Sequence, residues 1–166
     1  MRTTRFLREQ FIERPLDEVF AFYADAANLE RITPPWLNFR ILTPLPIPMR
    51  AGTLIEYQIR LRGLPMRWQT RIAEWNAPHG FMDVQVRGPY RVWEHRHEFH
   101  AVSGGTLVRD TIDYALPAGW LGELVRRFVV SGDIEKIFDH RRRALMTIFA
   151  LDSRVHPATA RAHEST

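Results

Sequence analysis

The 166-residue chain contains no cysteine, so it can form no disulfide and no cysteine-based zinc site, and it offers no thiolate nucleophile. It has no apolar run near the ~20 residues that a membrane-spanning helix needs, and residues 1–7 lack the apolar core of a signal peptide. No serine stands in a GxSxG context, and no glycine-rich phosphate loop is present. We therefore expect a cytoplasmic protein without an integral membrane segment.

Lysine is nearly absent as well, since Lys136 is the single lysine among 23 basic residues. The net charge of +4 and the isoelectric point near 10.1 would suit a nucleic-acid-binding protein. The arginines are spread along the chain and mixed with acidic residues, and their densest cluster is only residues 141–143. Because a nucleic-acid interface concentrates positive charge on one face, we expect no nucleic-acid partner.

The apolar pattern predicts one strand, two helices, six strands and a long final helix. Pro15 followed by Asp17 and Glu18 is typical of a helix start, and apolar residues from Ile134 to Phe149 recur at helical spacing. Alternating apolar residues predict strands at residues 4–13, 53–61, 66–75 and 106–117 and on both halves of residues 80–99, with a short edge strand at 39–43.

A final helix of about 18 residues would be roughly 27 Å long. Seven strands about 4.8 Å apart make a sheet of nearly the same width. We therefore predict an α+β fold in which a curved, seven-stranded antiparallel sheet wraps around a long C-terminal helix. Residues 1–152 would form a single domain, and residues 153–166, which are polar and aperiodic, a disordered tail.

The most informative stretch is residues 80–99, GFMDVQVRGPYRVWEHRHEF. In its second half, Trp93, His95, His97 and Phe99 alternate with valine and charged residues, so the four rings share one face of a strand. The charged face would meet solvent and the ring face an interior. Two histidines that line an interior are unusual, so function should be sought there.

The registers of the hairpins decide which residues face those histidines. A two-residue turn at 88–89 would turn Asp83 outward, whereas a three-residue loop at 88–90 places it inside, opposite His95. We favour the longer loop because proline is disfavoured at the second central position of a tight turn. A two-residue turn at 104–105 would place His97 opposite Ile112, and a four-residue loop at 62–65 would pair Leu61 with Met66.

On this register the interior holds polar and aromatic side chains from several strands. Arg141 joins them, because it lies on the apolar stripe of the final helix. A buried charge needs a partner, so we expect Arg141 to meet Asp110 or Asp83. The predicted ligand-binding residues are Tyr57, Trp68, Thr70, Gln85, Trp93, Asp110, Tyr114 and Arg141, and the predicted catalytic residues are His95, Asp83 and His97.

Six stretches carry a resemblance to a known family: LERITPPWLNF, AGTLIEYQIRL, RWQTRI, FMDVQVRGPY, WEHRHEF and IFDHR. In them the chain resembles the START-like, or SRPBCC, superfamily of the birch-pollen allergen, polyketide cyclases and coenzyme-Q-binding proteins. It is most similar to a bacterial branch described only as SRPBCC or cyclase proteins. The resemblance covers about residues 4–150 and implies a helix-grip fold and a START-like ligand-binding domain. That superfamily hosts carriers, sensors and enzymes on one scaffold.

Three functions fit these residues. The first is binding of a small hydrophobic or amphipathic ligand of lipid, polyketide or aromatic type in an internal cavity. The second is a cyclase, dehydratase or isomerase reaction in which His95, oriented by Asp83, moves a proton. The third is a regulatory module that binds a partner. The spacing of His95 and His97 also occurs in metal sites, but without cysteine or an HxxxH pair this is weak evidence, so we expect no metal and no cofactor. The protein would be a monomer or homodimer.

Overall fold

The computed structural model describes residues 3–61, 63–116 and 131–155. The sheet is antiparallel and has seven strands in the order β1-β7-β6-β5-β4-β3-β2. The predicted α+β helix-grip architecture is therefore confirmed. The elements are β1 (Thr4–Ile12), α1 (Leu16–Tyr23), η1 (Ala26–Asn28), α2 (Leu29–Ile32), η2 (Pro35–Leu37), β2 (Arg40–Ile41), β3 (Leu54–Leu61), β4 (Leu64–Asn76), β5 (Gly80–Arg87), β6 (Val92–Val102), β7 (Gly105–Ala115) and α4 (Ser131–Val155).

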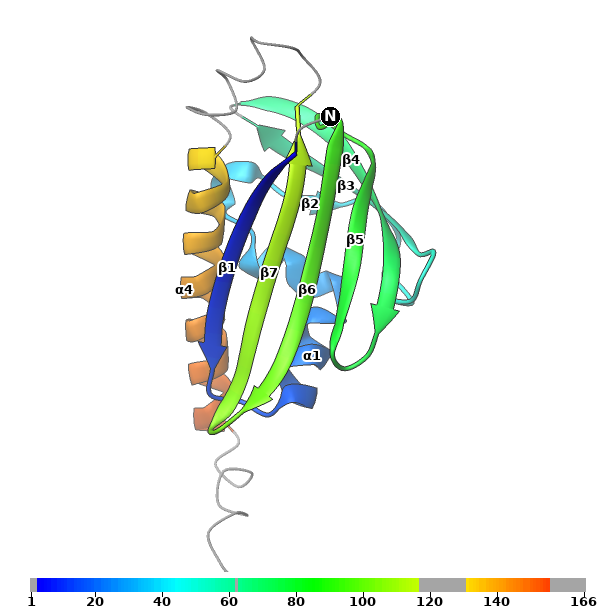
Figure 1. The fold of residues 1–166 in the computed structure, drawn as a ribbon. Coiled ribbons are helices and arrows are strands. Elements are labelled where there is room, and N and C mark those ends of the chain that lie inside the picture. Colours follow the sequence, from blue (N-terminus) through cyan, green and yellow to red (C-terminus); the bar gives the residue numbers. More distant parts are fainter. Residues whose placement is uncertain (1–2, 62, 117–130, 156–166) are drawn as a thin grey trace, which may run out of the picture.

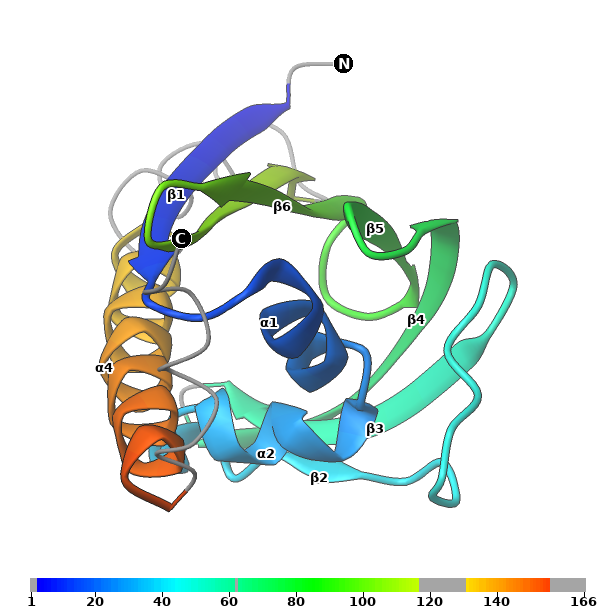
Figure 2. The ribbon, with the colours of Figure 1, turned by 90° about the horizontal axis from the view of Figure 1, so that it is seen from below.

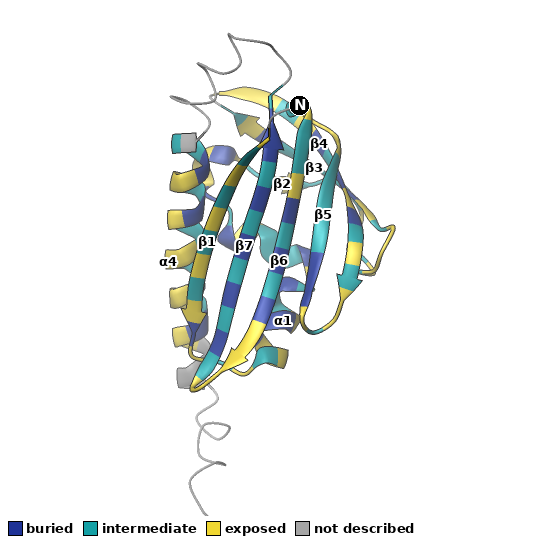
Figure 3. Ribbon diagram, viewed as in Figure 1, coloured by how far each residue is buried: buried dark blue, intermediate teal, exposed yellow. Residues whose placement is uncertain are grey.

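The sheet curves around the helices rather than lying flat against them. Seen along the strands, it wraps around α1, and α4 lies between β1 at one edge and α2 at the other (Figures 1 and 2). Strands β7 and β6 follow the edge strand β1, and buried and partly exposed residues alternate along β7 (Figure 3). Among the described residues, no helix has the length and apolar character needed to cross a membrane.

Local sequence explains both main helices. Pro15 caps α1, acidic residues occupy its first turn, and its buried side contains Val19, Phe20 and Tyr23. The buried residues of α4 follow the predicted stripe, from Ile134 through Phe138 and Leu145 to Phe149. At 25 residues α4 is longer than predicted, and it ends at Val155, beyond the expected domain boundary at residue 152. Residues 156–166 of the predicted tail lie outside the described residues.

The hydrophobic core has two parts. The larger part surrounds Phe20, whose ring packs against Trp75, Phe81 and Phe99 at centroid distances of 5.4, 6.5 and 5.5 Å. The smaller part joins the sheet to α4 and contains Ile112, Tyr114, Ile134 and Phe138. These packed regions hold the sheet and α4 together and fix the walls of the space between them.

The structure confirms one predicted register and corrects two. Asp83 lies opposite His95, as the three-residue loop requires. In the next hairpin the turn is at residues 103–104, so His97 pairs with Asp110 rather than with Ile112. Gly104 has a φ of +81°, which suits the second position of the turn, and leaves Gly105 to begin β7. Similarly, Leu61 pairs with Leu64 rather than with Met66, because β3 and β4 continue to a shorter turn.

Candidate functional site

A cavity of about 180 Å³ lies between the sheet, the short helices and α4. Its lining is mostly aromatic and aliphatic, with a few polar side chains. Eight of the predicted site residues line it: Tyr57, Trp68, Thr70, Asp83, Trp93, His95, His97 and Arg141.

The other three predicted residues have different places. The Gln85 side chain donates to the Tyr90 carbonyl oxygen (2.6 Å) and accepts from the Tyr90 backbone N–H (3.2 Å), so it fixes the loop between β5 and β6. Tyr114 is buried in the smaller core against α4. Asp110 is buried and is not among the lining residues, because the histidines lie between its carboxylate and the cavity. The prediction that these three residues line the cavity was wrong.

Sequence reasoning missed several lining residues. Tyr23 lies at the end of α1, and its ring is 5.9 Å from that of His97. Tyr90 was assigned only to a loop, yet its ring is 4.7 Å from that of Trp93. The apolar side of α1 was visible in the sequence, but nothing there indicated which of its rings would reach a cavity.

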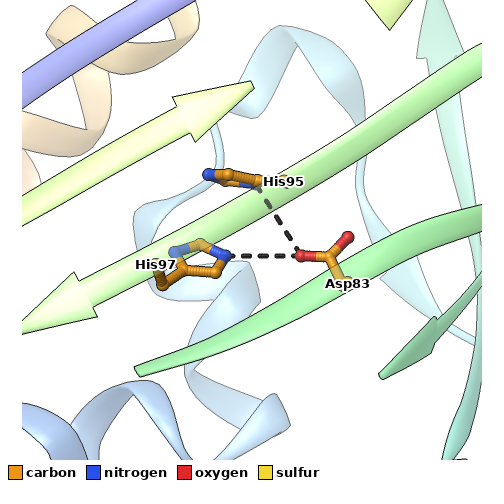
Figure 4. A group of neighbouring side chains, drawn as sticks. All are labelled: Asp83, His95 and His97. Carbon is orange, nitrogen blue, oxygen red and sulfur yellow. Dashed lines mark hydrogen bonds and ion pairs between the residues drawn. The ribbon is translucent and has the colours of Figure 1, made fainter. Parts of the chain in front are cut away.

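Four side chains form a closed polar network at the sheet wall. Nε2 of His95 lies 3.0 Å from Asp110 Oδ1, and Nδ1 of His97 lies 2.7 Å from the same oxygen, at an angle that does not make a hydrogen bond. On the cavity side, Asp83 Oδ2 lies 3.3 Å from His97 Nε2 and 3.8 Å from His95 Nδ1 (Figure 4). Each histidine therefore has one carboxylate behind it and one in front.

The charge in this network is not shared equally. Burial, and the neighbouring His97, lower the pKa of His95. Burial also acts to lower the pKa of His97, but the contacts with Asp110 and Asp83 outweigh it and raise that pKa. Burial alone would raise the pKa of Asp110, whereas its two histidine contacts hold it well below its usual range. The surroundings therefore favour the protonated form more at His97 than at His95.

Aromatic rings make up another part of the cavity lining. The rings of Tyr57 and Trp68 are stacked with centroids 6.0 Å apart, and Trp93 meets Trp68 edge-on at 5.3 Å. Burial, followed by the charge of Asp83, raises the pKa of Tyr57, so its phenol remains a neutral hydroxyl. Flat rings with neutral hydroxyl groups suit an aromatic or conjugated ligand.

Two side chains in the lining present buried donors that have no partner. Nε and Nη1 of Arg141 and Nε1 of Trp68 are buried and make no hydrogen bond within the described chain. The expected ion pair of Arg141 with Asp110 or Asp83 does not form. Instead, its guanidinium carbon lies 4.8 Å from the centroid of the Phe138 ring. Both acids are already engaged by the histidines, and Arg141 faces the cavity from α4.

The site thus combines three chemical elements. It has an aromatic wall for a flat apolar group, donors for an oxygen atom, and a histidine–carboxylate network that could move a proton or bind a metal. Asp83, His95 and His97 are the one group in the described part of the chain whose ligand atoms lie close enough to hold an ion, all within 4.8 Å of one another. The predicted catalytic role of these three residues stays a prediction.

The sequence was compared with protein families and with curated proteins. A family model described as "Polyketide cyclase / dehydrase and lipid transport" matches residues 12–140. No curated protein matches the sequence.

Solved structures show the same fold at low identity. The Zhui aromatase/cyclase from Streptomyces sp. R1128 is 14% identical with a TM-score of 0.72, over 99% of this chain and 100% of that one. A nucleoside-diphosphate sugar epimerase from Corynebacterium glutamicum is 21% identical with a TM-score of 0.70, over 92% of this chain but 30% of that one. The major latex-like protein 151 from Panax ginseng is 12% identical with a TM-score of 0.62, over 89% and 97% of the two chains.

Proposed function

Because the chain belongs to the polyketide cyclase / dehydrase and lipid transport family, we propose that it binds a small amphipathic ligand in the cavity between the sheet and α4. One observation supports this more than any other: an aromatic-lined cavity contains buried donors that no described residue satisfies. Buried donors are normally paired, and leaving one unpaired costs about 1–3 kcal/mol. An oxygen atom on the ligand would supply the missing acceptor.

The size of the cavity limits the ligand. A dry protein cavity of about 150 Å³ is known to hold benzene. A volume of about 180 Å³ therefore suits a single substituted ring. A polycyclic compound or a two-chain lipid would require α4 or the short helices to move.

The donors define the polar end of the ligand. Arg141 carries a positive charge and offers two nitrogen atoms, Nε and Nη1, and Trp68 offers a neutral N–H. A carboxylate, an enolate or a phenolate oxygen would meet this set better than an alcohol, because charge-assisted hydrogen bonds to arginine are stronger. We therefore propose a ring that bears an anionic or strongly polarised oxygen.

The test compares matched probes by calorimetry and thermal unfolding. Benzoate should bind and raise the melting temperature, whereas toluene, which has the ring alone, should bind more weakly, and 2-naphthoate should bind little. At a concentration 100 times the Kd, a ligand stabilises the fold by about 2.7 kcal/mol. For a domain of this size that corresponds to roughly 5–10 °C.

A pair of tryptophan substitutions on α4 supplies the control. Ile137→Trp fills the lining from α4 and should abolish benzoate binding, whereas Lys136→Trp, one residue earlier on the exposed side of the helix, should leave it intact. If no single-ring anion binds the wild-type protein, or if Ile137→Trp binds benzoate as well as Lys136→Trp does, the proposal is wrong.

A further inference from the structure

We propose that Asp83, His95 and His97 bind one divalent transition-metal ion at the cavity wall, with Asp110 as the residue that orients both imidazoles. This goes beyond the proposed ligand and can be tested without it. Sequence spacing alone gave little reason to expect a metal, because it could not show how the two acids lie around the histidines.

The separations of the ligand atoms suit a metal ion. Ligands at about 2.0–2.2 Å from a metal lie about 3.0 Å apart in an octahedral site and about 3.4 Å apart in a tetrahedral one. Asp83 Oδ2 lies 3.3 Å from His97 Nε2 and 3.8 Å from His95 Nδ1. The first value already falls within this range, and the second needs a contraction of about 0.4 Å. In Figure 4 the contacts of both imidazoles meet at one carboxylate oxygen of Asp83.

Asp110 holds the two imidazoles so that their other nitrogen atoms, His95 Nδ1 and His97 Nε2, face Asp83. Asp110 Oδ1 contacts the ring nitrogen of each histidine that faces away from Asp83. The contact with His95 Nε2, at 3.0 Å, is a hydrogen bond, and the contact with His97 Nδ1, at 2.7 Å, is an ion-pair contact. If those nitrogens carry the protons, the lone pairs of His95 Nδ1 and His97 Nε2 both face Asp83. Without a cation or an additional proton, two lone pairs would meet a carboxylate oxygen. A carboxylate behind a metal-binding histidine is the usual outer support of such sites.

Charge and access agree with this arrangement. Asp83 and Asp110 bring two carboxylates into a wall where both histidines are 6% exposed, and neither acid pairs with Arg141. A proton on one histidine would compensate only one of these two negative charges, whereas an ion of charge +2 held by two neutral imidazoles would compensate both. Asp83, His95 and His97 all line the cavity and Asp110 does not, so the remaining coordination positions would open toward the cavity.

The donor set selects the class of metal. Two imidazoles and one carboxylate suit Zn²⁺, Co²⁺ or Fe²⁺, whereas Mg²⁺ and Ca²⁺ prefer oxygen ligands alone. Three protein ligands with an open position are typical of zinc sites that bind a water or a substrate. We therefore expect Zn²⁺ and Co²⁺ to bind and Mg²⁺ not to compete.

The experiment titrates the full chain, stripped of metal by a chelator, with Zn²⁺ in a calorimeter. One ion per chain should bind. A second measurement does not depend on variants: in ¹⁵N NMR spectra of the wild-type protein, Zn²⁺ should shift the ring nitrogens of His95 and His97 and leave those of His100 unchanged. Co²⁺ should give an absorption spectrum typical of mixed nitrogen and oxygen ligands.

Three substitutions separate the roles, with an exposed histidine as the control. Asp83→Asn and His97→Gln should each remove stoichiometric binding, whereas His100→Gln, on the exposed part of the same strand, should retain it. Asp110→Asn should weaken Zn²⁺ binding by about 10- to 100-fold, as expected for an outer residue that positions the ligands. Circular dichroism of each variant shows whether it is folded.

The inference is overturned if wild-type protein binds no ion, if the ring nitrogens of His95 and His97 do not shift, or if folded Asp83→Asn binds Zn²⁺ as tightly as wild type. Benzoate binding measured in the presence of EDTA distinguishes failure of the metal site from failure of the proposed ligand. A protein that binds benzoate but no Zn²⁺ refutes the metal site alone, and one that binds Zn²⁺ but no single-ring anion refutes the proposed ligand alone.

Discussion

Replacing Arg141 by methionine should stabilise the empty protein and abolish binding of an anionic ring. Two guanidinium nitrogens of Arg141 are buried without a hydrogen-bond partner in the described chain, so the native residue bears a desolvation cost that no ion pair with Asp83 or Asp110 offsets. Methionine has a similar length and flexibility and carries no charge. The substitution therefore removes the cost and keeps most of the packing.

The magnitude follows from three effects. Replacing buried ionic groups by apolar residues is often neutral or stabilises a protein by about 1–4 kcal/mol. The contact of Arg141 with the Phe138 ring, at 4.8 Å, contributes about 0.5–1 kcal/mol that would be lost. Because Arg141 is only half-buried, the gain belongs at the low end of its range. We expect a net stabilisation of about 1 kcal/mol, or roughly 2–4 °C in melting temperature.

Urea denaturation of the metal-free protein and calorimetry with benzoate test the two halves of this prediction. Arg142→Met, at the next position on the exposed face of α4, should change stability by less than about 0.5 kcal/mol and leave benzoate binding unchanged. The reasoning is refuted if Arg141→Met loses 1 kcal/mol or more, because Arg141 would then be a structural partner. It is also refuted if the variant binds benzoate with wild-type affinity.

Three further predictions concern the frame of the cavity. Gly105→Ala should destabilise the protein by about 1–3 kcal/mol in urea denaturation, because a Cβ there would collide with the carbonyl oxygen of Ile12. Gly132→Ala, which has open space around it, should be neutral or stabilising. Equal effects of the two substitutions would contradict this. Gln85→Ala should cost about 1–2 kcal/mol through the loss of two hydrogen bonds to the loop, and wild-type stability would show that they are unimportant. Burial raises the pKa of Tyr23, Tyr57 and Tyr90, so in an alkaline absorbance titration these phenols should ionise only as the protein unfolds. Stability should therefore fall as the pH rises above about 10. Reversible ionisation of more than one of the four tyrosines near pH 10 in the folded protein would contradict this.

The sequence predicted the face of each strand better than it predicted the partners across the sheet. In both errors the true partner lies two residues from the predicted one on the neighbouring strand. Side chains two residues apart lie on the same face of a strand. His97 therefore faces the interior whether its partner is Ile112 or Asp110. Apolar alternation cannot distinguish such registers. Gly104 does not distinguish them either, because it lies within the turn in both registers.

The predictions that failed concern distances across the interior. The apolar stripe of α4 showed that Arg141 points inward, but not that Asp83 and Asp110 would already be engaged by histidines of the sheet. In the same way, inward orientation on β7 did not show that the carboxylate of Asp110 would be covered by the imidazoles. Such facts depend on the curvature of the sheet and on side-chain conformations. The apolar pattern along a single strand or helix contains no information about the curvature of the sheet or about side-chain conformations.

The acidic groups and the free donors around the cavity do not pair with one another. This explains why Arg141→Met is expected to raise the stability of the protein and to abolish binding of an anionic ring. The acids of the wall, Asp83 and Asp110, are held by the histidines of β6. By contrast, the buried nitrogens of Arg141 and Trp68 make no hydrogen bond with any residue that the structure describes. If Arg141 reached Asp83, a buried ion pair would satisfy both groups and leave nothing for a ligand to complete. Because it does not, the empty protein bears the cost of unpaired donors, and an anionic oxygen would relieve it. A residue that improves binding for this reason must lower the stability of the empty fold.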